Sequence, residues 1–361
     1  MKTYTEGFEA GASNLLFDCA GIKVGDRVLL VGEPDASAFF EPALCADVAR
    51  VAMSSGIEAT IILAAPVSDA SHFPQVVSDA MQEADVIIFF SRLGDQLRFI
   101  DTPGNGKKVM CYTLTRNLMS SAFASTSYSA MKQTHDLLKS QITSAKRYKI
   151  EATCGTSLSG EIIDDESSLS ALTDFSVELF PVMIFPPINC HHLNGQLVLK
   201  DFLLSSSTRA YDDSVLMLAS PVVASIEDSR MVDFDGDEKV IAGIRKQLVR
   251  AASLTGGDPY QINSWHTGIN PCTFFEGDPY ADLERWGSVA YGSPRYTHIH
   301  AAGNDPGDIS IQLFDASISF DERLFWDAGR FVFLDRPELQ SFNQNQPSAA
   351  LDSSTIMSIG I

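Results

Sequence analysis

The sequence predicts an α/β protein in which a parallel-sheet, Rossmann-like N-terminal layer is followed by a mixed α+β C-terminal domain. In the first 115 residues, four short and continuous apolar runs alternate with helical patterns, which is typical of strands covered on both faces. From about residue 175 the chain instead carries β-type stretches separated by turn signals. We therefore expect two domains, residues 1–170 and residues 171–361, with the active site in the second.

The expected elements of the first domain are alternating strands and helices. The apolar runs are Val28–Gly32, Ala59–Leu63, Val86–Phe90 and Lys108–Tyr112. Helical spacing marks residues 42–53, 75–84 and 128–144. The turn after the first run has neither of the glycine motifs that bind phosphate, and its acidic residues would repel a pyrophosphate. We therefore do not expect a nucleotide-binding function.

The second domain is expected to be built mainly from strands. Residues 148–153 are already strand-like, and Asn194-Gly195 is typical of a hairpin turn. A strong helical pattern covers residues 238–255. The β-type stretches are residues 182–185, 196–199, 215–218 and 220–226.

Charge and cysteine usage exclude several classes of function. Lys and Arg number 26 against 46 Asp and Glu, so the formal net charge is −20, which opposes binding to nucleic acid or to an anionic membrane surface. The apolar runs are far shorter than the roughly 20 residues that cross a bilayer, and the N-terminus does not resemble a secretory signal. The six cysteines form no CxxC pair, which argues against a zinc ribbon or a disulfide framework. We expect a cytoplasmic globular protein.

The histidines carry the strongest functional signal. His266, His298 and His300 are three of only seven histidines, and they lie within 35 residues. Glycine and asparagine stand beside them, which is typical of strand ends that run into tight turns. Because His298 and His300 are two positions apart on an expected strand, their side chains should share one face. Imidazoles placed in this way serve as metal ligands, as acid/base groups or as substrate-binding groups.

Several segments around these histidines resemble one enzyme superfamily. Gly268–Pro271, Glu284–Gly287 and Thr297–Asn304 are similar to the aminopeptidase T type of leucyl aminopeptidases, and more so to the related 2,5-dihydroxypyridine 5,6-dioxygenases. Residues 25–30, 155–158 and 194–198 also resemble segments of this superfamily, and they occur in the same order along the chain. The resemblance implies a divalent metal pair in the aminopeptidases and one ferrous ion, Fe(2+), held by two histidines and an aspartate in the dioxygenases.

The resemblance also assigns ligands, with two departures. His266 matches the first ligand of the dioxygenases, and Asp315 falls on the carboxylate of their His-x-Asp segment. Leu313 occupies the position of the histidine of that segment, and Pro181–Ile184 lacks the glutamate of a Pro-x-Gly-Glu segment. Either His298 or His300 therefore replaces the missing imidazole, or the metal has been lost.

Other side chains near these segments are further candidates for the site. Glu284 is a candidate acid/base group and Arg285 could hold an acidic substrate by two hydrogen bonds, although a surface ion pair explains both equally well. His191 and His192 face opposite ways on an extended chain, so at most one can line a cavity. The remaining candidates for binding a planar ligand are Trp265, Tyr291, Arg295 and Tyr296.

Three enzyme functions follow from these observations. The first is a non-haem iron ring-cleaving dioxygenase acting on a small aromatic or heteroaromatic acid. The second is a metal-dependent aminopeptidase-like hydrolase, and the third a metal-free relative that uses His266 and a carboxylate for acid/base chemistry such as hydration, cyclisation or isomerisation. A non-enzymatic binding protein is the remaining class. The expected partner is a small-molecule substrate, and the resembling families imply a homo-oligomer.

Overall fold

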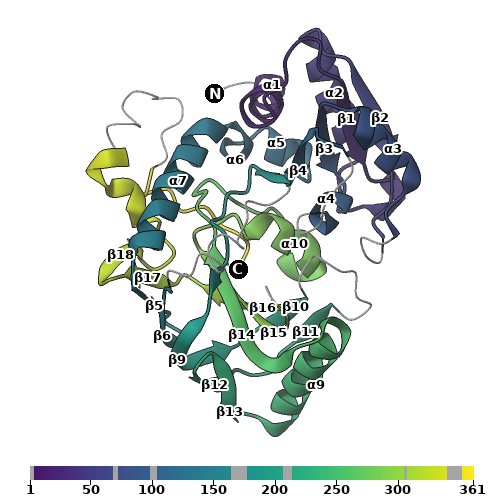
Figure 1. Cartoon of the computed structure of the whole chain (residues 1–361). Coiled ribbons are helices and arrows are strands. Elements are labelled where there is room, and N and C mark those ends of the chain that lie inside the picture. Colours follow the sequence, from purple (N-terminus) through teal and green to yellow (C-terminus); the bar gives the residue numbers. More distant parts are fainter. Residues whose placement is uncertain are drawn as a thin grey trace.

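The structure is a computed structural model that describes residues 4–67, 72–97, 104–163, 177–205, 214–304, 307–339 and 352–361. A parallel sheet with its helices occupies one end of the molecule, and a large antiparallel sheet occupies the other (Figure 1). The helix α10 (Leu283–Ala290) lies between them. This arrangement confirms the α/β layer and the mixed α+β region that the sequence predicts.

The parallel sheet has the strand order β2-β1-β3-β4-β7. The inner strands β1 and β3 are completely buried, because helices cover the two faces of the sheet. β2 is an edge strand, and its Leu63 is 61% exposed, so the expectation that this run is covered on both faces is wrong. The strands are β1 (Val28–Gly32), β2 (Ala59–Leu63), β3 (Val86–Phe90), β4 (Lys107–Cys111) and β7 (Glu178–Phe180).

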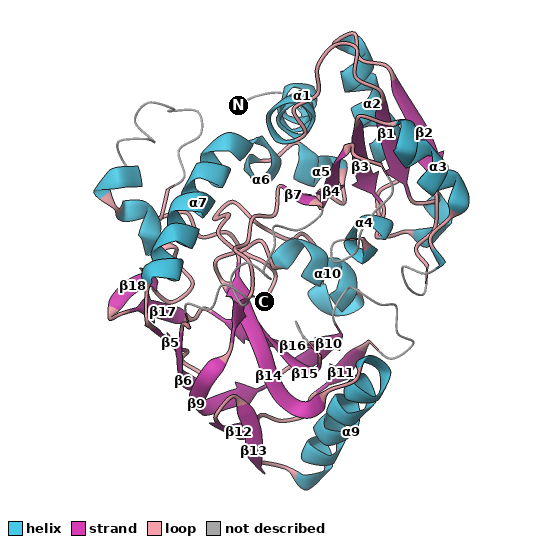
Figure 2. Cartoon of the chain, viewed as in Figure 1, coloured by secondary structure: helices cyan, strands magenta, loops and turns pink. Residues whose placement is uncertain are grey.

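Helices connect and cover these strands, as Figure 2 shows. Thr115, Ser121 and Ser127 precede three of them, and each side-chain oxygen accepts a hydrogen bond from a backbone N–H of the first turn. The helices are α1 (Tyr4–Ser13), α2 (Leu44–Ser54), α3 (Gln75–Glu83), α4 (Leu93–Gln96), α5 (Arg116–Met119), α6 (Ala122–Ser125) and α7 (Tyr128–Ser144), with a π-helical turn at Asn14–Cys19 and a 3-10 turn at Asp35–Ser37.

The antiparallel sheet runs in the order β11-β10-β16-β15-β14-β13-β12-β9-β6-β5-β17-β18, and β8 adds to β14. Its long central strand β14 crosses the lower half of Figure 1. The strands are β5 (Arg147–Glu151), β6 (Ser157–Glu161), β8 (Ile188–Asn189), β9 (His191–Leu199), β10 (Phe202–Ser205), β11 (Val215–Met217), β12 (Val222–Glu227), β13 (Arg230–Asp235), β14 (Asp258–Thr267), β15 (Tyr296–Gly303), β16 (Ile309–Phe314), β17 (Ser317–Phe320) and β18 (Arg323–Trp326).

Two helices fix the strands that carry the histidines. α9 (Glu238–Thr255) begins after Asp237, whose carboxylate accepts hydrogen bonds from two N–H groups of its first turn, and it packs on β14 and β15. α10 begins after Asp282, whose carboxylate accepts one hydrogen bond, from the N–H of Arg285. Its Trp286 is completely buried, and the indole N–H donates to the carbonyl of Ile359 at 2.6 Å. Short 3-10 turns lie at Pro279–Ala281 and Val332–Asp335.

Near the expected domain boundary, the chain alternates between the two sheets. Residue 170 itself lies outside the described residues. β5 and β6 precede it and belong to the antiparallel sheet, whereas β7 follows it and completes the parallel sheet. The chain therefore passes between the sheets more than once, and a cut at one position does not separate them.

The expected strand at residues 182–185 is not formed. Only Ile184 makes an isolated bridge, to Gly268, before pairing resumes at β8. Pro186 and Pro187 lie between the two, and because proline has no N–H it cannot continue the ladder. Among the helices of the described ranges, none is long and apolar enough to cross a membrane.

Candidate metal centre

Two neighbouring antiparallel strands bring the three histidines together. In the register of β14 and β15, His266 pairs with His298 and Ser264 pairs with His300. Paired residues point to the same face of a sheet, as do residues two apart on one strand. His266, His298 and His300 therefore share one face. The shared face that the sequence predicts for His298 and His300 is present in the structure, and the register adds His266 to them.

The imidazoles are in direct contact and largely buried. The Nε2 atoms of His266 and His300 are 3.0 Å apart, and the ring centroids of His266 and His298 are 4.1 Å apart. One ring nitrogen from each of the three residues lies within 4.8 Å of the others. His266 and His298 are 4% and 5% exposed, and His300 is half-buried. We call these three residues the histidine cluster.

The backbone sets the orientation of His266. Its Nδ1 lies 3.4 Å from the carbonyl oxygen of Phe185. A carbonyl oxygen only accepts hydrogen bonds, so Nδ1 carries the proton and Nε2 presents a lone pair to the other two rings. A histidine that binds a metal commonly donates its second N–H to a carbonyl in this manner.

Two of the predicted aromatic residues pack on the cluster. The ring of Tyr296 is 5.1 Å from that of His298, and Tyr291 meets His298 edge-on at 5.6 Å. Tyr296 is 2% exposed, and burial raises the pKa of its hydroxyl, while hydrogen bonds with Gln312 and Ser310 partly offset this effect. The phenol of Tyr296 therefore remains protonated at neutral pH and is a hydrogen-bond donor.

Gln312, which is not among the residues predicted from the sequence, lies on the same face as the cluster. It pairs with His298 across β15 and β16 and is 2% exposed. Its Nε2 donates to the carbonyl of Ser310 at 3.0 Å, whereas its buried Oε1 has no hydrogen-bond partner in the part of the chain that the structure describes. The alternation along Ile309–Phe314 is the signal that could have found it.

The first sheet contributes to the surroundings of the cluster through Tyr112. This residue follows β4 and packs edge-on against Tyr291 at 5.5 Å. Its hydroxyl donates to Asp95, which is 4% exposed. A row of contacts thus connects Asp95, Tyr112 and Tyr291 to His298. Sequence patterns carry no signal for this connection, because it joins segments that lie far apart in the chain.

Trp265 and Leu313 lie on the opposite face of the sheet from the cluster. Trp265 pairs with Ile299, and Leu313 pairs with Thr297, so the alternation of the strands turns both away from the histidines. Trp265 is fully buried, and its ring stacks on Phe320. The expectation that Trp265 binds a ligand beside the histidines is therefore wrong, and Leu313 does not stand where a ligand of this cluster would be.

Asp315 and Arg295 bind each other instead of joining the cluster. Nε and Nη2 of Arg295 donate to the two carboxylate oxygens of Asp315 at 2.7 and 2.8 Å. This pairing raises the pKa of the Arg295 guanidinium. Among the residues that the structure describes, the group of possible metal ligands contains no aspartate or glutamate. The expectation that Asp315 completes the ligand set is not met.

The two candidates on α10 also lie elsewhere. Glu284 is exposed in the first turn of the helix. Nε of Arg285 donates to the carbonyl of Phe39 at 2.7 Å, which ties α10 to the first part of the chain. Arg285 therefore makes a structural contact away from the histidine cluster, and Arg295 is occupied by Asp315. Arg285, which was expected to hold an acidic substrate, contacts the Phe39 carbonyl instead, and Arg295, which was expected to bind a planar ligand, pairs with Asp315.

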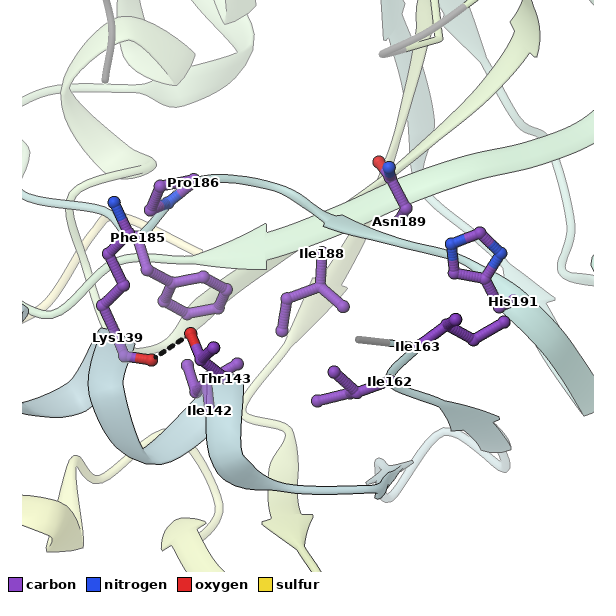
Figure 3. A pocket seen from close by; sticks show the side chains of 10 residues that line it. All are labelled: Lys139, Ile142, Thr143, Ile162, Ile163, Phe185, Pro186, Ile188, Asn189 and His191. Carbon is purple, nitrogen blue, oxygen red and sulfur yellow. Dashed lines mark hydrogen bonds between the residues drawn. The ribbon is translucent and has the colours of Figure 1, made fainter. Parts of the chain in front are cut away.

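His191 and His192 begin β9 at an irregularity in its register with β6, where His192 has a left-handed φ of 48° and simple strand alternation does not apply. His192 is exposed, and its Nδ1 lies 2.8 Å from Asp228. His191 lines a separate cavity beside α7 (Figure 3).

Comparison with known proteins rests on the structure, since no family model and no curated protein matches the sequence. The structure of 2,5-dihydroxypyridine dioxygenase from Pseudomonas putida KT2440 superposes with a TM-score of 0.58 at 11% identity, covering 94% of this chain and all of that one. Wild-type AmpT from Thermus thermophilus gives a TM-score of 0.53 at 10% identity, covering 91% of this chain and all of that one.

The chain has the fold of these two proteins. Both are named as enzymes of the superfamily that the sequence resembles, so the resemblance is confirmed at the level of the fold. At such low sequence identities, the structural similarity is evidence for the fold alone. The histidine cluster is therefore the basis for any proposal about the chemistry of this chain.

Proposed function

We propose that this chain is an enzyme in which the histidine cluster holds a single divalent metal ion. The separation of 3.0 Å between Nε2 of His266 and Nε2 of His300 is the observation that supports it most. Two imidazole nitrogens bound to one ion at about 2.0–2.1 Å are themselves ~2.9–3.3 Å apart. Three imidazoles from two strands fit such an ion, and the Phe185 carbonyl holds His266 in the tautomer that leaves Nε2 available.

The reaction that we propose is oxidative ring cleavage of a small aromatic or heteroaromatic acid with ferrous iron. An iron ion held from one side would supply open positions for substrate and O2. Tyr296 would donate a hydrogen bond from its protonated hydroxyl to a substrate oxygen, and Tyr291 would pack against the substrate ring. The structural similarity to 2,5-dihydroxypyridine dioxygenase supports a heteroaromatic ring in the substrate, and it does not bear on the acid group.

The cluster gives less support to a two-metal hydrolase. Paired metal ions are normally bridged by carboxylates, which neutralise part of the combined charge. The possible ligands in the described ranges are three imidazoles, which carry no negative charge, and Asp315 is bound to Arg295. A single ion is therefore the better fit. The aminopeptidase-like function remains the alternative that the similarity to AmpT supports.

One observation favours a metal-free function as a second candidate. A distance of 3.0 Å also fits an N–H···N hydrogen bond, in which His300 donates from Nε2 to the lone pair of His266. Such a pair can take up and release a proton and so serve acid/base chemistry. Metal binding and this hydrogen bond exclude each other, because both use the lone pair of His266.

Metal analysis of protein purified without chelator separates these functions. One iron per chain, together with O2 uptake on addition of 2,5-dihydroxypyridine under reducing conditions, supports the proposal. Two ions per chain, with release of an amino-terminal residue from a peptide, support the hydrolase. Turnover that persists in excess chelator, with no bound metal, overturns the proposal in favour of the acid/base pair.

A further inference from the structure

Gln312 places an unsatisfied acceptor on the face of the sheet that carries the histidine cluster. Strands β14, β15 and β16 are neighbours, so His266, His298 and Gln312 form one row across them. Gln312 is 2% exposed, and its Oε1 has no hydrogen-bond partner within the described part of the chain. A buried polar atom is normally bonded to protein, to water or to a ligand, so a partner for this oxygen is expected.

The surroundings of the Gln312 amide distinguish its nitrogen from its oxygen. The nitrogen donates to the backbone carbonyl of Ser310 at 3.0 Å. It also faces the hydroxyl of Tyr296, where burial raises the pKa and a hydrogen bond with Gln312 partly offsets the rise. A carbonyl oxygen only accepts hydrogen bonds, so the opposite orientation of the amide would set two oxygens against each other. Oε1 is therefore the end of the side chain that remains for a ligand.

The residues around this amide place it beside the cluster. Ser310 pairs with His300 across β15 and β16, and the ring of Tyr296 is 5.1 Å from that of His298. The amide thus contacts one residue that pairs with a histidine of the cluster and one that packs on another. Residues paired across strands have Cβ atoms roughly 4.5–5.5 Å apart, and a glutamine side chain is long enough to cross toward its neighbour. Oε1 and the imidazole nitrogens can therefore approach the same ion.

We propose that Gln312 is a fourth protein ligand of the metal ion, which it binds through Oε1. Because this role needs an ion at the histidine cluster, it rests on the function proposed above. Amide and carbonyl oxygens are ligands for divalent ions. The Gln312 oxygen extends the set of imidazoles without the carboxylate of Asp315, which is bound to Arg295. One further ligand still leaves positions open on an octahedral ion for a substrate and O2.

Two substitutions at Gln312 separate the amide oxygen from the amide nitrogen. Gln312→Met and Gln312→Glu both remove the N–H groups, and only Gln312→Glu keeps an oxygen. Gln312→Met should weaken binding of Fe(2+) at least about tenfold, because loss of a group outside the ligand set already costs ~10–100-fold. Gln312→Glu should bind the ion more tightly than the wild type. Anaerobic competition against a coloured chelator measures both affinities.

Thr297→Val is the matched control for loss of an unsatisfied polar atom. Thr297 is 1% exposed, its hydroxyl has no hydrogen-bond partner among the residues that are described, and it pairs with Leu313 on the face away from the cluster. Its replacement should leave the affinity unchanged. The visible absorption of bound Co(2+) depends on the number of ligands, so it should change in Gln312→Met and stay the same in Thr297→Val. Thermal unfolding checks that each variant folds.

Four outcomes contradict the assignment, and they separate it from the function proposed above. A wild type that binds no divalent ion overturns both. One ion per chain, with the same affinity and cobalt spectrum in the wild type and in Gln312→Met, overturns the ligand role of Gln312 alone. Weaker binding in both Gln312 variants would show that the N–H groups matter and not the oxygen. If Gln312→Met does not fold, weaker binding in Gln312→Glu is sufficient to overturn the assignment, and tighter binding supports it.

Discussion

The Nε2 atoms of His266 and His300 are 3.0 Å apart, although the residues are separated by 34 positions in the chain. The contact runs between strands β14 and β15, and it brings one ring nitrogen of each residue close to the same point. His298 lies directly opposite His266 in the same ladder. The register of the sheet sets the spacing of these residues, and a set spacing is what a metal site or a proton-transfer pair requires.

Replacing His300 is the most direct test of metal binding by the cluster. It is the most exposed of the three histidines, so His300→Ala removes a ligand without opening a cavity in the core. We expect the affinity for Fe(2+) to fall by more than the ~10–100-fold that is typical for loss of an outer partner. Anaerobic titration of the variant with Fe(2+) measures this affinity. His192→Ala, at an exposed histidine, is the matched control, and equal affinities in the two variants would remove His300 from the ligand set.

Gln312 and Leu313 are neighbours on β16 and face opposite sides of the sheet, so substitutions at the two positions can be compared as a test of the metal site. Gln312→Glu places a carboxylate opposite His298, at about 4.5–5.5 Å between Cβ atoms, and should tighten binding of a divalent ion. Leu313→His places an imidazole in the apolar core and should leave metal affinity unchanged while lowering stability by about 2–3 kcal/mol. Metal titration and thermal unfolding of both variants check this. Tighter binding in Leu313→His alone would show that the register is shifted by one residue.

The strands of the parallel sheet could be predicted from the sequence because they are continuous apolar runs. β1 and β3 coincide with two of the runs, and β2 does also, although its side chains proved half exposed. Sequence patterns do not state which strand lies at an edge, since strand order depends on contacts between distant segments. For the same reason the return of β7 to the first sheet could not be predicted.

Period-two alternation predicts part of the candidate site, and it would also have excluded Trp265, which is next to His266 on β14. His298 and His300 share a face, as their spacing requires. Asp315 was assigned by its match to the His-x-Asp segment of the resembling dioxygenases, but it follows the end of β16 with φ of 50°, a left-handed conformation that redirects the side chain. Arg295 then binds its carboxylate. The pairing of α10 with Phe39 through Arg285 is a long-range contact that no local pattern encodes.

Asp315→Asn separates a structural role of this residue from a metal-binding role. Asparagine tolerates the left-handed backbone that Asp315 adopts, so the change removes the charge and little else. Because the ion pair with Arg295 is partly exposed, we expect a loss of about 1 kcal/mol in the free energy of unfolding. The metal content per chain should not change. A variant that keeps its stability but loses its metal would restore Asp315 as a ligand.

His135 should make stability depend on pH in mildly acidic solution. It is 5% exposed on α7, and burial lowers its pKa from the usual value of 6.5, while the hydrogen bond to Asp136 opposes the shift and the charges of Lys132 and Lys139 add to it. The unfolded chain therefore binds a proton more readily than the folded one below about pH 6.5. Stability due to His135 is complete above that pH and is lost as the pH falls toward the folded pKa, with a slope of at most about 1.4 kcal/mol per pH unit.

Urea unfolding of the wild type and of His135→Gln from about pH 5 to about pH 8 measures this effect, because an ordinary histidine titrates within that range. The difference in slope between the two proteins isolates His135 from the other six histidines. We expect the variant to lose less stability on acidification than the wild type, and the gap to become constant above about pH 7.5, where histidine is neutral in both states. His192→Gln controls for the removal of an imidazole from the surface. Parallel curves for the wild type and His135→Gln would show that burial does not disfavour the protonated form of this ring.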